Sequence, residues 1–241
     1  MKSLTRYSEA ALPTSHGDFR VVVYRVDQNP NDEHVAMVRG DIRARQDVLC
    51  RVHSECFTGE VLGSLRCDCQ EQLDLALRRI AREDSGVLVY LRQEGRGIGL
   101  GNKVRAYALQ DQGVDTVDAN LALGFDADLR TYEMAAAILR DLSVDSVRLM
   151  TNNPAKLRGL EQAGIRVTSH VPHWVEASAE NADYLRVKQR RMGHLAAVSG
   201  SDSAAPANRP DSPLDSMSPQ GSTDRGRPAT NVTTLEKDAS G

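Results

Sequence analysis

The spacing of the apolar residues first changes near residue 70, from the pattern of strands to that of a helix. This change limits the folds that the chain can adopt. Before it, three runs rich in β-branched residues are separated by turn residues, at 18–26, 34–40 and 47–53. Such runs predict strands, which we expect to pair antiparallel. After it, Leu73 and Leu77 recur at helical spacing, and Gly86 ends the run. The sequence therefore predicts a β-rich N-terminal part followed by a helix.

The rest of the chain continues with helices and strands in alternation. A short buried strand at 87–91, a helix at 100–113 and a helix at 131–142 precede a strand at 146–151 and a helix at 153–164. In the last helix Asn153 is suited to the N-cap, Pro154 to the first position and Gly164 to the stop. The pattern predicts an α+β (mixed α/β) fold with ligand sites in the turns that follow strands.

The two ends of the chain and its charge narrow the class of protein. From residue 198 the sequence is rich in Ser, Pro, Asp and Gly without apolar periodicity, so we expect a disordered tail over 198–241 and one domain over 1–197. No segment resembles a signal peptide or reaches the roughly 18 apolar residues of a membrane span, which predicts a cytoplasmic protein without membrane contact. A net charge of -3 argues against nucleic acid as a partner.

Three of the four cysteines, Cys56, Cys67 and Cys69, lie within fourteen positions. In a reducing compartment such a cluster is more often metal-binding or catalytic than disulfide-bonded. The Cys-x-Cys step would place two thiols on one side of an extended segment, while the third returns from a loop with two glycines. Three thiolates favour zinc and leave one position open, as in catalytic sites. A structural site closed by Cys50 or His53 is the alternative.

The segment "LRQEGRGIGLGNKVRAY" follows the strand at 87–91 directly. Its glycines permit close approach of a ligand, and Arg92, Arg96 and Lys103 offer charge-assisted donors for a polyphosphate. Glu94 could accept hydrogen bonds from the N1–H and amino groups of guanine. The alternative is a flexible glycine-rich loop with solvated arginines.

Two further turns carry polar residues that suit ligand binding but have a simpler explanation. In "GFDADLR", Asp126 and Asp128 precede a helix that could begin at Thr131, so ordinary helix capping would account for them. In "TNNPAKLRG", Thr151 and Lys156 could meet a phosphate at the N-terminus of a helix. A plain cap with a solvated lysine is the alternative there.

Four segments carry a resemblance to a known family. "RVHSECFTGEVLGSLRCDCQEQL", "RQEGRGIGLGNKVRAYALQDQGVDTVDAN", "LGFDADLR" and "LMTNNPAKLRGLEQAGI" stand in the family's order. They closely resemble GTP cyclohydrolase II, a zinc enzyme of riboflavin biosynthesis, and the match runs from about Ala11 to His194. Nothing resembles the 3,4-dihydroxy-2-butanone-4-phosphate synthase domain of some relatives, so we expect the stand-alone form.

The resemblance implies an activity and a site for it. Cys56, Cys67 and Cys69 would hold one catalytic Zn²⁺ that activates the water attacking C8 of guanine, so that GTP loses formate and pyrophosphate. Asp128 would be the proton acceptor, Arg130 a nucleophile at the α-phosphate, and Tyr107 could orient or deprotonate the second water. The residues that would contact GTP in the cleft are Arg51, Val52, His53, Ser54, Glu55, Gln72, Glu94, Gly95, Arg96, Thr116, Thr151 and Lys156.

Several alternatives stay open at the level of sequence. Arginine is effectively always protonated, so Arg130 could instead act as a cationic clamp on the phosphate. Tyr107 could be a half-buried helix aromatic. The chain could stop at a formylated pyrimidine, or could bind a nucleotide without turnover; a zinc nucleobase deaminase is disfavoured because its His-x-Glu and Pro-Cys-x-x-Cys motifs are absent. The family also implies a homodimer and Mg²⁺ on the triphosphate.

Overall fold

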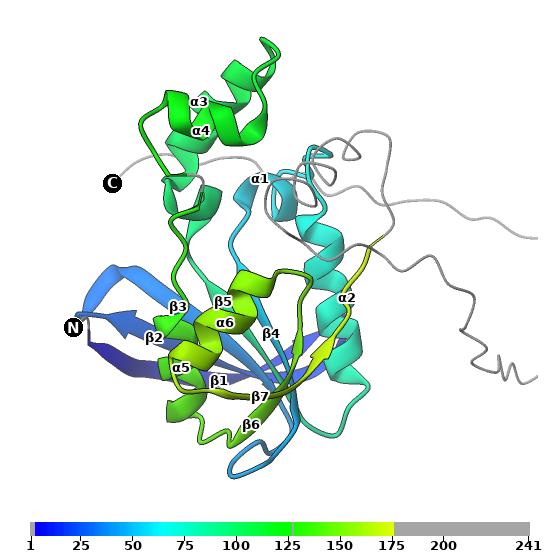
Figure 1. Ribbon diagram of the computed structural model, residues 1–241. Coiled ribbons are helices and arrows are strands. Elements are labelled where there is room, and N and C mark those ends of the chain that lie inside the picture. The colour runs from blue at the N-terminus through cyan, green and yellow to red at the C-terminus, as the bar shows by residue number, and fades with distance from the viewer. Residues whose placement is uncertain (1–2, 127, 176–241) are drawn as a thin grey trace, which may run out of the picture. The chain divides into compact units, whose positions relative to one another are not determined.

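The computed structural model describes residues 3–126 and 128–175, which belong to one compact unit, Met1–Val198. The tail predicted over 198–241 lies outside the described residues. One seven-stranded sheet organises the unit, in the order β1-β2-β3-β5-β4-β6-β7 (Figure 1). Its strands are β1 (Leu4–Thr14), β2 (Gly17–Val26), β3 (Asn29–Arg39), β4 (Val48–Ser54), β5 (Gly86–Leu91), β6 (Ser146–Met150) and β7 (Arg166–Val171).

The directions of the strands divide the sheet into two parts. Strands β1, β2, β3 and β5 pair antiparallel in that order, whereas β4 runs parallel to both β5 and β6, and β6 parallel to β7. The expectation that the run at 47–53 belongs to an antiparallel set is therefore wrong. β4 is parallel to β5 because the connection between them contains a helix. The helix carries the chain back to the end of the sheet where β4 begins, so that β5 runs in the same direction.

Most of the helices lie where the apolar period predicts them. They are α1 (Phe57–Glu60), α2 (Cys69–Ala81), α3 (Gly99–Gln110), α4 (Thr116–Ala122), α5 (Glu133–Asp141) and α6 (Pro154–Gln162), with a 3-10 turn, η1 (Glu94–Gly97). The Asn153 side chain caps α6 by accepting from the Ala155 N–H at 2.9 Å, as predicted. Thr131 does not begin α5, because Tyr132 occupies its N-cap.

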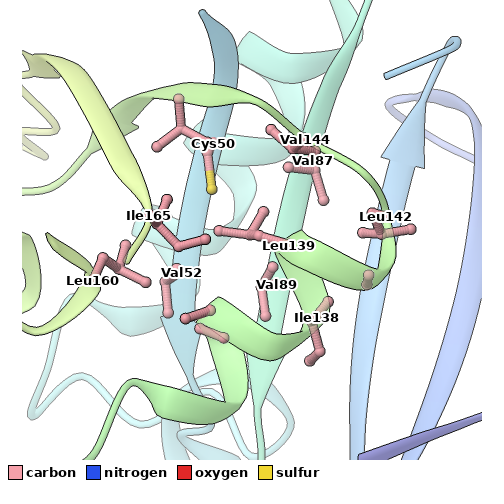
Figure 2. Close-up of a cluster of buried hydrophobic side chains, with 14 of the residues drawn as sticks. Cys50, Val52, Val87, Val89, Ile138, Leu139, Leu142, Val144, Leu160 and Ile165 are labelled. Atoms are coloured by element: carbon pink, nitrogen blue, oxygen red, sulfur yellow. The ribbon is translucent and has the colours of Figure 1, made fainter. Parts of the chain in front are cut away.

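Two apolar clusters cover the two faces of the sheet. One packs Val52, Val89 and Leu149 against Leu139 of α5 and Leu160 of α6, and Figure 2 shows several of these side chains around Cys50. The other packs the second face, including Leu49 and Leu88, against Ile80 and its neighbours in α2. Neighbouring strand residues point to opposite faces. Strands β4, β5 and β6 are therefore buried on both sides, which makes them a rigid base for the turns at their ends.

The mixed α/β fold class is confirmed. Strands β4, β5 and β6 are parallel, and their carboxyl ends share one edge, where Ser54 is paired with Leu91. The segments that follow these strands begin at 55, 92 and 151, so this edge brings together three of the four motifs of the sequence. Among the described residues, no helix is both long and apolar enough to cross a membrane.

Candidate metal and ligand site

A cavity of about 610 Å³ lies at this edge, a size typical of small-molecule sites. It gathers most of the residues that the sequence singles out, although they come from segments nearly one hundred positions apart. These are Arg51, His53, Ser54, Glu55, Cys56, Cys67, Cys69, Gln72, Glu94, Gly95, Arg96, Tyr107, Arg130, Thr151 and Lys156.

Three predicted site residues are placed differently. Val52 packs in the apolar cluster of α5 and α6, and only its carbonyl faces the site, where it accepts from Lys156 Nζ at 2.7 Å. Asp128 does not line the cavity but binds Arg130, which does. Thr116 begins α4, and its side chain lies outside what the structure describes.

The three predicted cysteine ligands form one group. Their Sγ atoms lie within 4.8 Å of one another, and those of Cys56 and Cys67 are 3.5 Å apart. Cys56 is the N-cap of α1 and Cys69 is the first residue of α2, so the expected extended segment is wrong and a helix start brings Cys69 in. Three sulfur atoms this close suit a thiophilic divalent metal such as zinc.

Gly59 leaves room for the cysteine group. A Cβ at this position would lie 2.9 Å from Cys67 Sγ, closer than Cβ atoms normally approach, and 3.3 Å from Cys56 Sγ, which is a tight contact. Neither Cys50 nor His53, the two alternatives for a fourth ligand, belongs to the cysteine group in the portion of the chain that the structure describes. Cys50 is fully buried in an apolar cluster, and His53 Nε2 lies 2.6 Å from Glu60 Oε1.

Lys103 joins the cysteine group to the glycine-rich turn. Its Nζ lies 3.1 Å from Cys56 Sγ and 2.7 Å from Glu94 Oε1. Burial lowers the pKa of Lys103, but the hydrogen bond to Glu94 and the charge of Cys56 outweigh it and raise the pKa overall. The sequence suggests Lys103 only as a phosphate donor; its long side chain turns to the thiol because α3 packs beside the cysteine loop.

The carboxylate of Glu94 is largely occupied by the protein. Its Oε2 accepts from the Phe57 N–H at 2.6 Å, and its Oε1 accepts from Gly95 N–H and Lys103 Nζ, both at 2.7 Å. A carboxylate has about four acceptor positions. One position is therefore left for a ligand such as guanine.

Cationic side chains also line the cavity, and two of them keep buried donors without a protein partner. These are Nε of Arg51 and both Nη atoms of Arg96, among the residues that the structure describes. Burial lowers the pKa of Arg51 to about 10. Lys156 is buried, so the prediction of a solvated lysine is wrong. Buried donors of this kind are suited to an anionic ligand.

Asp128 and Arg130 form a bidentate ion pair, with Nε to Oδ1 at 2.8 Å and Nη2 to Oδ2 at 2.6 Å. Asp128 also accepts from the Arg130 backbone N–H at 3.0 Å. Burial alone would raise the pKa of Asp128, but the hydrogen bonds and charge of Arg130 outweigh it and lower the pKa. These contacts go to Arg130, so helix capping does not explain Asp128.

Tyr107 lies on α3, facing the cysteine loop. Its hydroxyl is 3.3 Å from Thr58 Oγ1, and the Arg66 guanidinium lies 4.9 Å from its ring centre. Burial is the largest influence on its pKa and raises it. Tyr107 is therefore a neutral hydrogen-bonding group at the cavity wall, which favours orienting a water over deprotonating one.

The fold and the site together define a mixed α/β domain in which three thiols that could hold a metal ion line the same cavity as several cationic side chains. The GTP cyclohydrolase II family matches residues 5–172. GTP cyclohydrolase-2 of Actinobacillus succinogenes is 53% identical over 194 residues, which cover 80% of this chain and 89% of that protein. The chain belongs to the GTP cyclohydrolase II family, and the family and enzyme class recognised from the motifs are confirmed.

Other relatives are longer. Riboflavin biosynthesis protein RibBA of Chlamydia trachomatis is 56% identical over 194 residues, covering 79% of this chain and 45% of that protein. RibBA of Salinispora tropica is 56% identical over 195 residues, covering 80% of this chain and 48% of that protein. The chain thus spans about half the length of the RibBA relatives that it matches.

Proposed function

We propose that this chain hydrolyses GTP with a zinc ion bound by Cys56, Cys67 and Cys69. The guanine imidazole ring is opened at C8, and formate and pyrophosphate are released. The product is 2,5-diamino-6-hydroxy-4-(5-phosphoribosylamino)pyrimidine, and the reaction is the first step of riboflavin biosynthesis. Family membership and the names of the relatives support the reaction class.

One observation carries the proposal: the three thiols and the cationic side chains line the same cavity. A metal bound by thiolates supplies an activated water at neutral pH. The donors of Arg51 and Arg96 that lack a protein partner suit a triphosphate, and Lys156 adds charge beside the N-terminus of α6. A nucleoside triphosphate can therefore meet both the metal and its phosphate partners in one pose.

We assign Arg130 the role of a cationic clamp on the phosphate. As a nucleophile it would have to lose a proton to Asp128, but the lowered pKa of Asp128 makes that carboxylate a weak base. The bidentate pair instead holds the guanidinium in place at the cavity wall. Preorganised cations of this kind stabilise charge that develops on a transferring phosphoryl group.

The remaining residues receive supporting roles in the proposal. Tyr107 orients the water that removes formate. The GTP contacts come from Arg51 to Glu55, Gln72, Glu94 to Arg96, Thr116, Thr151 and Lys156. Mg²⁺ accompanies the triphosphate, as is usual for this ligand. A homodimer remains a prediction from the resemblance, and a cytoplasmic location remains a prediction from the sequence.

Product analysis tests the proposal. Zinc-loaded protein is incubated with GTP and Mg²⁺, all products are identified by mass spectrometry, and formate and pyrophosphate are measured in parallel. Equal amounts of formate, pyrophosphate and the diaminopyrimidine are expected. A product that keeps its formyl group would identify an enzyme that stops after ring opening. Intact GTP despite measurable binding would identify a nucleotide-binding module instead.

A further inference from the structure

Lys103 differs from the other cations of the cavity in what it contacts. Arg51 and Arg96 keep guanidinium nitrogens without a partner in the described part of the chain. The ammonium of Lys103 instead lies between Cys56 Sγ at 3.1 Å and Glu94 Oε1 at 2.7 Å. Its side chain is 12% exposed. Its position matches a partner of the metal centre better than a donor to phosphate.

Glu94 also binds the ammonium of Lys103. The same carboxylate accepts the backbone N–H of Phe57, the residue that follows Cys56, at 2.6 Å. It also accepts the Gly95 N–H at 2.7 Å. One carboxylate thus connects the lysine to the backbone beside a metal ligand, so the positions of Cys56 and Lys103 depend on each other.

We propose that Lys103 is a positioning residue of the metal centre, donating a hydrogen bond to the Cys56 thiolate while Glu94 holds the ammonium in place. Three thiolates around a divalent cation would leave one negative charge unbalanced. The ammonium is shared between Glu94 and Cys56, so it offsets part of the negative charge on the Cys56 sulfur. A thiolate that accepts a hydrogen bond donates less electron density to its metal, so the metal stays a stronger Lewis acid. Partners of metal ligands tune metals in this way.

Only the effect on rate rests on the proposed GTP reaction. The contact with the metal centre can be tested without nucleotide, by loading the protein with Co²⁺ and recording the thiolate-to-cobalt charge-transfer band. Lys103→Met removes the charge and the donor at similar length, whereas Lys103→Arg keeps both. Arg105→Met is the matched control, because Arg105 is exposed on the same helix and contacts Asn102.

The proposal predicts an ordered series of spectra. The band should move to longer wavelength in Lys103→Met, move less in Lys103→Arg, and stay in place in Arg105→Met. If Lys103→Met fails to fold, Lys103→Gln, which removes the charge but keeps a polar side chain, carries the test. A folded Lys103→Met protein that binds one Co²⁺ with an unchanged band would overturn the proposal, as would an unchanged band in a folded Lys103→Gln protein.

A double-mutant cycle tests the part assigned to Glu94. Glu94→Gln should shift the band in the wild-type background and have little further effect in Lys103→Met, because the carboxylate acts through the lysine. Equal shifts in both backgrounds would contradict that path. With GTP as substrate, kcat of Lys103→Met should fall by about 10- to 100-fold with little change in KM. Absence of any GTP turnover would refute the proposed function and leave the cobalt result standing.

Discussion

Cys50 and Cys56 are six residues apart, yet they belong to regions with opposite chemistry. Cys50 lies in the apolar cluster with Leu139 and Ile165 (Figure 2), where burial raises the pKa of its thiol to about 12. At Cys56, hydrogen bonds from Cys67 and Cys69 lower the pKa, and Lys103 adds to the effect. Surroundings, and not residue type, therefore separate an inert thiol from one that is suited to bind a metal.

The two regions also differ in how far their polar groups are satisfied. The apolar cluster around Cys50 holds few polar atoms, whereas the cavity keeps unpartnered buried donors on Arg51 and Arg96, among the residues described. A ligand with acceptor oxygens in the cavity would pair with these donors, whereas the buried sheet beneath supplies the stability of the domain.

The largest expected effect separates the two kinds of cysteine. Cys67→Ser should lose the metal and lower formate release by at least about a thousandfold, since several kcal/mol of transition-state stabilisation are removed. The variant should stay folded by circular dichroism. Cys50→Ser, the control, should keep its metal and its activity. Unfolding of Cys67→Ser would instead show that the metal is structural.

The next effect concerns the apolar cluster. Leu139→Ala removes a fully buried side chain from the packing of α5 against the sheet, which should lower the free energy of unfolding by about 2–5 kcal/mol. Metal content, measured by mass spectrometry of the native protein, should not change. The exposed Leu121 is the matched control for Leu→Ala. Loss of metal at unchanged stability would mean that the two regions are not separate.

A smaller effect should appear in the dependence of stability on pH. His173 is buried, its Nε2 lies 2.8 Å from the Gln72 carbonyl, and burial first and the Arg51 charge second lower its pKa from 6.5 to about 2. The unfolded chain therefore binds the extra proton below about pH 6.5, and stability falls as pH drops through this window.

Denaturant unfolding checks this prediction. One such histidine should make the protein about 2 kcal/mol less stable at about pH 5 than at about pH 7.5. In His173→Gln, whose amide can still donate to Gln72, the difference should shrink by that amount; His53, with its pKa lowered mainly by burial, leaves a residual slope. An unchanged pH dependence in the variant would show that His173 does not titrate as described.

The smallest effect tests the space around the cysteines. In Gly59→Ala the added methyl meets Cys67 Sγ and Cys56 Sγ, so the thiols must shift and metal affinity should fall by about tenfold. Gly101→Ala is the control, because nothing lies within 4 Å of a Cβ at that position. Chelator competition measures both affinities. Equal metal affinities in the two variants would mean that the methyl added at residue 59 does not displace the thiols.

The spacing of the apolar residues predicts those helices and strands that are buried on one face or on both. The run that became β5 and the helix α2 were evident, because their apolar residues mark a buried strand and a buried helical face. The pattern does not reveal strand β1, because β1 is the outermost strand of the sheet and is largely exposed. The short helix α4 has too few turns to show a period. The parallel direction of β4 follows from the helix in its connection to β5, a signal that the sequence contains but that the antiparallel expectation does not use.

The grouping of the site residues was predictable from the sequence, and the contacts among them less so. Cysteine spacing predicts the group of three thiols, and the motifs predict that Arg51, Arg96 and Lys156 meet at one cavity. The roles of Lys103 and Glu94 depend on where long side chains turn after α3 and η1 pack against the cysteine loop. Such contacts are set by tertiary packing, so spacing along the chain could not reveal them.

In the proposed function, the cysteine-bound zinc and the cationic cavity act as one centre on GTP. To test this directly, the metal is removed with a chelator, Zn²⁺ is added back in steps, and the rate of formate release is measured at saturating GTP and Mg²⁺ after each step. We expect a rate that rises in proportion to bound zinc and levels off at one ion per chain. Formate release that is independent of zinc, or absent at full occupancy, would contradict the proposed function.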